Sequence, residues 1–217
     1  MSGFQIVNGL AGLLIVTSLL VITARRPTGS AIYYALQSLV LVAIFLTLGT
    51  SVGSHELTAW AATSFVTKVL LVPILMTRLM GRLEDTRLGS GERIAPAVSV
   101  LLAAVVVVLC YWVVDGVSLP AAAAIKPALA VSLGHFFLGL AAIVTQRNIL
   151  KQVFGYCLME NGSHLTLALL AAQAPEIVEI GIATDAVFAV VVMAVLGLQI
   201  HRTLGTLDAD QLTTLKG

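Results

Sequence analysis

Hydrophobic residues run along this chain in seven long stretches, separated by short breaks that carry charges, prolines and glycines. Each stretch holds about 20 mostly apolar residues, the length that an α-helix needs to cross the hydrocarbon core of a bilayer. The runs are too long and too evenly apolar for the alternating strands of a membrane barrel. The pattern predicts an all-α polytopic membrane helix bundle with seven transmembrane helices, at 3–24, 31–52, 56–79, 94–115, 124–146, 150–173 and 177–200.

Composition agrees with a membrane location and excludes several other classes. The 217 residues are 59% hydrophobic and 11% charged, with a mean hydropathy of +1.01, whereas soluble domains are roughly 25% charged. A net charge of +1 gives no basic surface for nucleic acid. Cys110 and Cys157 lie in apolar runs without cluster spacing, so we expect buried thiols and no metal or other cofactor in this chain. No positive region precedes the first apolar run, which predicts a retained span rather than a signal peptide.

The positive charges predict the orientation of the chain in the membrane. Loops rich in Lys and Arg face the cytoplasm. Ten of the 12 cations follow or flank spans 1, 3, 5 and 7, the opposite side has Lys126 alone, and Lys68 falls inside a span. We therefore expect the N-terminus outside and the C-terminus in the cytoplasm. The ten are Arg25, Arg26, Arg78, Arg82, Arg87, Arg93, Arg147, Lys151, Arg202 and Lys216.

Five ionisable residues fall at membrane depth and are the candidates for function. Lys68, His135 and Glu160 lie near the middle of spans 3, 5 and 6, and Asp185 lies somewhat shallower in span 7. His164 follows Glu160 by one turn on the same helix face. A charge at a helix centre costs about 2.5–3.5 kcal/mol, so such groups face the bundle interior, a wet cavity or a partner. They are predicted to form a proton relay, and hydrogen bonding that only pairs helices is the alternative for each, above all for the two histidines.

Other residues near these candidates carry structural expectations. Pro73 follows Lys68 by five residues and predicts a kink beside the lysine. Gly155 and Gly162 are expected to let an adjacent helix come close. Glu160 and His164 are two potential ligands without an HExxH motif or a second histidine cluster, which argues against a metal site.

The order of the spans indicates a division into three parts. Spans 1–3 and 5–7 superpose without gaps at an offset of 121 residues, which pairs Arg26 with Arg147. A parallel repeat would explain this, and chance similarity between apolar segments is the alternative. We expect a three-helix unit with a cytoplasmic loop at 1–93, a connecting fourth helix and loop at 94–123, and a second three-helix unit with a C-terminal tail at 124–217.

Several stretches resemble a known family. SFVTKVLLVP, KPALAVSLGHFFLGL, QRNILKQVFGYCLMENGSHLTLALLA and the tail TLDADQLTTLKG resemble the hydrogenase-4 component E family, membrane subunits of formate-hydrogenlyase type [NiFe] hydrogenase complexes. Spans 5–7 are also similar to the small K-type subunit of respiratory complex I. That pattern has an Arg-Asn pair opening its second helix, matched here by Arg147 and Asn148, and a buried glutamate near an Asn, matched by Asn161. Glu160 falls about one turn later than that glutamate. Asp185 falls about one turn earlier than another glutamate, which the family pattern has in its third helix.

The resemblance implies a non-catalytic subunit of an oxidoreductase complex in the bacterial inner membrane, with no active site of its own. Its partners would be antiporter-like and quinone-site-like membrane subunits and, indirectly, the [NiFe] hydrogenase and iron–sulfur subunits. The buried Glu, Lys and His residues would then belong to a file that links redox chemistry to proton movement. A purely structural membrane scaffold is the alternative, and an independent secondary transporter is a third reading. Proton and sodium are both open as the ion moved.

Overall fold

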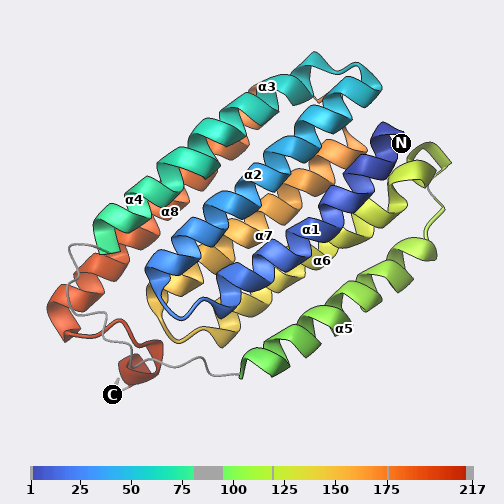
Figure 1. The fold of residues 1–217 in the computed structure, drawn as a ribbon. Coiled ribbons are helices and arrows are strands. Elements are labelled where there is room, and N and C mark those ends of the chain that lie inside the picture. The colour runs from blue at the N-terminus through green and yellow to red at the C-terminus, as the bar shows by residue number, and fades with distance from the viewer. Residues whose placement is uncertain (1, 81–94, 119, 175, 214–217) are drawn as a thin grey trace.

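All seven predicted spans form helices in the computed structural model, which describes residues 2–80, 95–118, 120–174 and 176–213 (Figure 1). The third span is one continuous rod made of α3 (His55–Ser64), the π-helix η1 (Phe65–Leu71) and α4 (Val72–Met80). The others are α1 (Gly3–Thr23), α2 (Pro27–Val52), α5 (Pro96–Asp115), α6 (Lys126–Thr145), α7 (Ile149–Leu170) and α8 (Glu176–Leu204). Two short 3-10 turns, η2 (Pro120–Ile125) and η3 (Ala209–Thr213), complete the described chain.

Six of the described helices are long and apolar enough to cross a membrane: α1, α2, the α3–α4 rod, α5, α6 and α8. The seventh, α7, is 22 residues long and more polar, and most of its surface is covered because it packs against α1, α2, α6 and α8. A central helix can carry polar side chains because protein rather than lipid surrounds it. The predicted all-α polytopic membrane bundle is therefore confirmed, with α7 at its centre.

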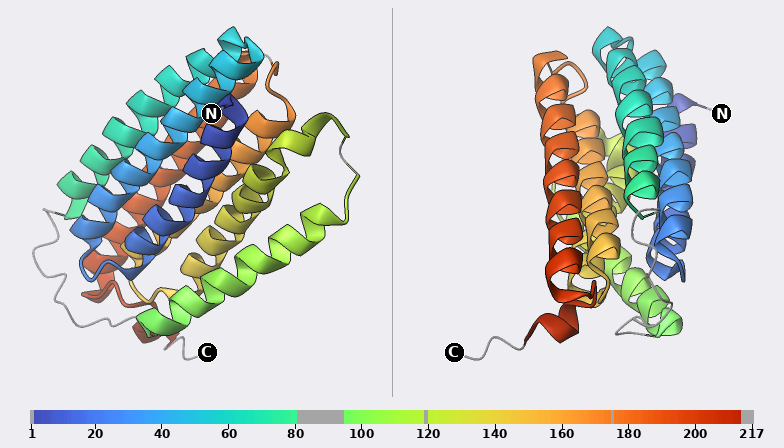
Figure 2. Two further views of the ribbon diagram at one scale, coloured as in Figure 1. Left: turned by 45° about the vertical axis from the view of Figure 1, so that its right-hand side comes forward. Right: turned by 90° about the vertical axis from the view of Figure 1, so that its left-hand side faces the viewer.

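The helices form two layers of three. One layer holds α1, α2 and the α3–α4 rod, and the other holds α6, α7 and α8 (Figure 2, right). Across the layers α1 contacts α6, α2 contacts α7, and the rod contacts α8. Counterparts at the predicted offset thus lie side by side. The repeat itself, and the division at 1–93, 94–123 and 124–217, stay predictions.

The connecting helix α5 stands at the edge of the bundle. It packs mainly against α6, with a smaller contact to α1 (Figure 1). Much of its surface is open, including Leu101, Val108 and Trp112, whose exposed fractions are 64%, 65% and 76%. An apolar groove of about 560 Å³ runs between α5 and α6 and is lined by Leu109 and Phe137 among others. These surfaces suit lipid or a neighbouring membrane protein.

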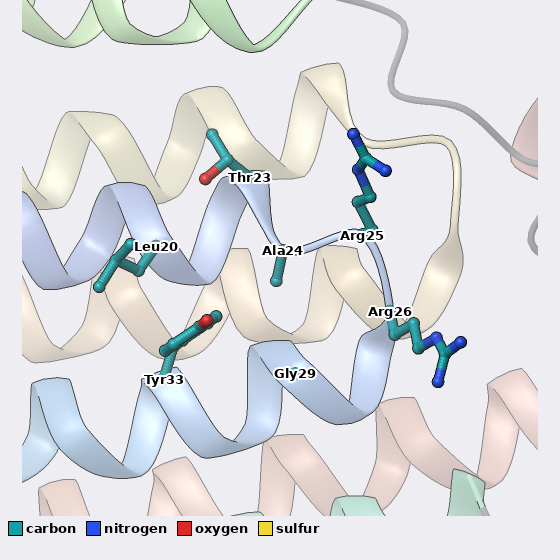
Figure 3. A pocket seen from close by; sticks show the side chains of 7 residues that line it. All are labelled: Leu20, Thr23, Ala24, Arg25, Arg26, Gly29 and Tyr33. Carbon is teal, nitrogen blue, oxygen red and sulfur yellow. The ribbon is translucent and has the colours of Figure 1, made fainter.

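Charge is separated between the two ends of the bundle. The ends of α1, α4, α6 and α8 lie together at one end, and they carry all the described loop cations except Lys126, which starts α6 at the other end (Figure 1). A pocket of about 380 Å³ opens at the charged end between α1 and α2, with Arg25, Arg26 and Tyr33 in its lining (Figure 3). The side chains of Arg25 and Arg26 point in different directions there. Which end faces the cytoplasm stays a prediction, and Arg82, Arg87, Arg93 and Lys216 lie outside the described residues.

Three glycines let α6 and α7 approach each other closely. A Cβ atom added at Gly162 would lie 2.5 Å from the backbone nitrogen of Phe136, and one at Gly155 would lie 2.9 Å from the nitrogen of Ile143. Gly139 on α6 faces the backbone of α7 in the same way. The close approach predicted for Gly155 and Gly162 is confirmed, and it packs the polar centre of α7 firmly against α6.

Candidate functional site

Lys68, Glu160 and His164 meet in one cluster between the third span and α7. The Lys68 Nζ donates to Glu160 Oε1 at 2.7 Å and to Oε2 at 2.9 Å, and it lies 2.9 Å from His164 Nδ1. The lysine and histidine are each 1% exposed, and the glutamate side chain is 12% exposed. A lysine ammonium has three N–H groups, so these three contacts use all of them.

A local change of helix type holds Lys68 in this position. Residues 65–71 form a π-helix, in which the Val72 N–H donates to the carbonyl of Thr67, five residues earlier. Pro73 follows immediately and has no N–H to give to the Lys68 carbonyl in the same register. The kink expected beside Pro73 stays a prediction, whereas the structure shows a π-helix at this point. Such segments often mark functional sites, because they re-aim side chains within a long helix.

Aromatic rings enclose the imidazole of His164. The ring of Phe45 from α2 lies 5.0 Å from it, and the ring of Trp60 from α3 lies 5.3 Å from it, centroid to centroid. Lys68 holds Nδ1, whereas His164 Nε2 is buried without a hydrogen-bond partner among the described residues. Because Lys68 donates to Nδ1, a neutral His164 carries its proton on Nε2.

His135 belongs to a second, uncharged network in the bundle core. Its Nδ1 lies 2.7 Å from Ser18 Oγ on α1, and its Nε2 lies 3.0 Å from Gln37 Nε2 on α2. Ser18 donates its hydroxyl proton to the Leu14 carbonyl, so it accepts from His135 Nδ1–H. Gln37 in turn accepts at its Oε1 from Asn161 Nδ2 of α7 at 2.8 Å. The network joins α1, α2, α6 and α7. Its last member, Asn161, directly follows Glu160 in the sequence.

Asp185 lies apart from both clusters. Its side chain is exposed on α8 and takes no part in the Lys68–Glu160 ion pair. Gly197 of α8 faces Ile149 at the start of α7. Because α7 and α8 are antiparallel, twelve residues back along α8 brings Asp185 to about the depth of Glu160. It therefore stands at the right depth but on the outer side of the bundle.

Arg147 and Asn148, at the start of α7, have structural roles: one binds the C-terminal tail and the other caps the helix. The Asn148 side chain caps α7 by accepting from the backbone nitrogens of Leu150 and Lys151. Arg147 pairs with Asp210 of the tail, with 2.9 Å between Nε and Oδ2. The backbones of the tail and of this loop are also bonded to each other, from Ile149 to Leu207 and from Ala209 to Arg147. This pair therefore docks the C-terminal tail against the bundle.

Sequence reasoning missed several members of these clusters. Ser18, Gln37, Trp60 and Ser64 are all buried next to the predicted residues. The signal that could have found them is a polar atom inside an apolar run, which Gln37 in particular carries in the middle of span 2. Within the described residues, no group of three His, Cys, Asp or Glu side chains could hold a metal ion.

The chain is similar to several known proteins over most or all of its length. Residues 127–217 match the family model of NADH-ubiquinone/plastoquinone oxidoreductase chain 4L. The chain is 57% identical over all 217 residues to hydrogenase-4 component E of Escherichia coli, covering 100% of both proteins, and equally so to that of Shigella flexneri. An uncharacterized protein of Mycobacterium tuberculosis is 26% identical over 211 residues, covering 97% of this chain and 96% of its own. No solved structure matches the chain. The resemblance inferred from the sequence is confirmed, and this chain belongs to the hydrogenase-4 component E family, with a complex I chain 4L-like C-terminal half.

Proposed function

We propose that this protein is a non-catalytic membrane subunit of a formate-hydrogenlyase type [NiFe] hydrogenase complex, in which Lys68, Glu160 and His164 pass protons through the bundle. The complex would lie in the bacterial inner membrane and consist of antiporter-like and quinone-site-like membrane subunits beside the hydrogenase and iron–sulfur subunits. The family membership supports this setting. The observation that carries the relay is the three-way contact at Lys68 Nζ.

The chemistry of this cluster favours a relay over a packing role. A buried ion pair contributes little net stability, because desolvation of the two charges offsets their attraction. Apolar residues of similar size would hold α7 against the third span at least as well. In contrast, an acid and an imidazole that each lie within 3 Å of the same amine can exchange protons with it when a neighbouring charge changes.

His135 and Asp185 take different parts in the proposal. His135 contacts Gln37, which accepts from Asn161, and such side-chain amides fix positions rather than pass protons. We assign it the task of holding Asn161, and with it the centre of α7, in place. Asp185 lies exposed on α8 at about the depth of Glu160, so it would act where a neighbouring subunit covers that face.

A purely structural scaffold is the second candidate function. The large apolar surface of α5 supports it, since exposed faces of this kind bind lipid or other subunits. Under this reading, the buried polar contacts would only select helix partners, and their neutral replacements would leave energy coupling intact.

Proton uptake into inverted membrane vesicles during formate-driven hydrogen evolution separates the two functions. Glu160→Gln keeps the shape of the side chain and removes its charge, and Asp115→Asn removes an exposed charge at the end of α5, at the edge of the bundle, as a control. Native gels check that each variant assembles. We expect Glu160→Gln to make hydrogen at a near-normal rate with proton uptake lost, and Asp115→Asn to behave as wild type. Normal uptake in an assembled Glu160→Gln complex would leave the scaffold as the function.

A further inference from the structure

We propose that Ser64, Trp60 and His164 bind one or two water molecules, and that this water carries the proton from His164 toward the end of the bundle where α3 begins. The inference rests on the proposed relay and extends it by a specific exit step. It adds two residues, Ser64 and Trp60, that neither the sequence pattern nor the family resemblance assigns.

Three buried polar atoms carry the inference. His164 Nε2, Trp60 Nε1 and Ser64 Oγ are fully buried, and none has a hydrogen-bond partner among the described residues. The three residues are at most 1% exposed. Burying a polar group without a partner costs about 1–3 kcal/mol each. Trp60 contacts the His164 ring, so one bound partner that these atoms share would remove much of this cost.

The donor inventory identifies that partner as a molecule that can accept. The indole Nε1 can only donate, and His164 Nε2 also donates when Lys68 donates to Nδ1. The Ser64 hydroxyl can either donate or accept. Water satisfies such a set, because it accepts two hydrogen bonds and donates two.

The hydroxyl of Ser64 also differs from its neighbours on the same helix. Thr58, Thr63 and Thr67 each donate to a carbonyl four residues earlier, as hydroxyls in apolar helices usually do. Ser64 makes no such bond. It lies one turn from Trp60 and one turn from Lys68, both of which contact His164, so its hydroxyl is on the side of the helix that faces the imidazole.

The placement of these residues gives the path a direction. His164 lies one turn beyond Glu160 toward the end of α7 at Leu170, and Trp60 lies one turn before Ser64 toward the start of α3 at His55. Because α3 and α7 run in opposite directions, both steps lead to the same end of the bundle (Figure 1). Under the predicted orientation that end faces outward.

The transfer step conserves charge and involves no electrons. Lys68 gives a proton to His164 Nδ1, and the N–H bond at Nε2 breaks as its proton passes to the bound water. A second proton, taken up by the Glu160 carboxylate from the opposite side of the cluster, then passes to Lys68 and restores the ion pair. One proton has left the cluster on the side of Ser64, and the imidazole has changed tautomer, so it must regain the Nε2–H form before the next cycle.

Two substitutions at Ser64 test the water site in the intact complex. Ser64→Val fills the space with methyl groups, whereas Ser64→Gly removes the hydroxyl and leaves room for a second water. Thr63→Val is the control, because the half-buried hydroxyl of Thr63 bonds only its own helix. We expect Ser64→Val to lose proton uptake at least five-fold per hydrogen evolved, while Ser64→Gly and Thr63→Val keep at least half of it.

The outcomes separate this inference from the proposed function. If Glu160→Gln uncouples the complex and Ser64→Val does not, the water path is wrong and the relay stands. If neither uncouples it, the relay itself is wrong. Should Ser64→Val fail to assemble, Trp60→Phe decides, because it keeps the ring and removes the N–H: it should reduce uptake at least two-fold, and unchanged uptake would overturn the site. A cryo-EM map of the complex at a resolution that shows ordered water should contain density within 3.5 Å of His164 Nε2, and a protein-filled position there would also overturn it.

Discussion

Alanine at Gly139 or Gly162 is expected to force α6 and α7 apart. The new Cβ at Gly162 would lie 2.5 Å from the nitrogen of Phe136 and 2.9 Å from the Ser132 carbonyl oxygen, and at Gly139 it would lie 2.6 Å from the Cα of Met159. Ordinary contacts to a Cβ are 3.4–4 Å long. All these neighbours are backbone atoms, which cannot rotate away. The helices must therefore separate locally by about 1 Å to relieve the overlap.

The loss of stability follows from the steep fall of van der Waals attraction with the distance between atoms. A gap of about 1 Å forfeits up to half of the attraction of each atom pair across the contact, and overpacking itself costs about 1–3 kcal/mol. We expect each substitution to destabilise the bundle by about 2–4 kcal/mol. It also shifts the side of α7 that carries Glu160 relative to Lys68, so coupling should fall together with stability.

Thermal stability of the solubilised complex, followed by size-exclusion chromatography after heating, measures the effect. Gly12→Ala on α1 is the matched control, because a Cβ there meets nothing within 4 Å. Alanine is favoured over glycine within a helix by roughly 0.5–1 kcal/mol, so this control should be neutral or slightly stabilising. Midpoints for Gly139→Ala and Gly162→Ala that equal that of Gly12→Ala would refute the reasoning.

Three further predictions concern the charges. Lys68→Met leaves Glu160 buried without its partner and should cost about 3–5 kcal/mol, whereas the double variant with Glu160→Gln should regain most of the lost assembly on native gels. Equal loss in both would contradict the ion-pair account. Asp210→Ala breaks a partly exposed ion pair with Arg147 and should change the free energy of unfolding by less than about 1 kcal/mol. A large drop in the melting midpoint would show that this ion pair, rather than the backbone hydrogen bonds, holds the C-terminal tail in place. A reporter enzyme fused after the last residue should be active only in its cytoplasmic form, and activity of a periplasmic reporter would reverse the predicted orientation.

The elements of this fold could be derived from local sequence. Each apolar run became a helix within a few residues of its predicted bounds, because a chain in lipid must satisfy its backbone hydrogen bonds within each segment. The depth of Lys68, Glu160 and His164 was equally readable, since position along a helix fixes depth at 1.5 Å per residue. Gly155 and Gly162 were identified for the same local reason, as small residues on a polar helix.

Which polar groups meet was decided only by the tertiary structure. Lys68 and Glu160 are 92 residues apart in the chain. The sequence of neither span predicts that the third helix and α7 are neighbours. Depth says nothing of which way a side chain faces, so Asp185, at a suitable depth, is exposed on the outer side of α8. Similarly, Pro73 predicted a kink, but the π-helix over Phe65–Leu71 that carries Lys68 was not expected from the sequence. The sequence by itself determined how deep each charge lies, because hydrophobicity and helical rise act locally. Packing between the two layers determined the partners, because each contact depends on the rotation of two helices at once.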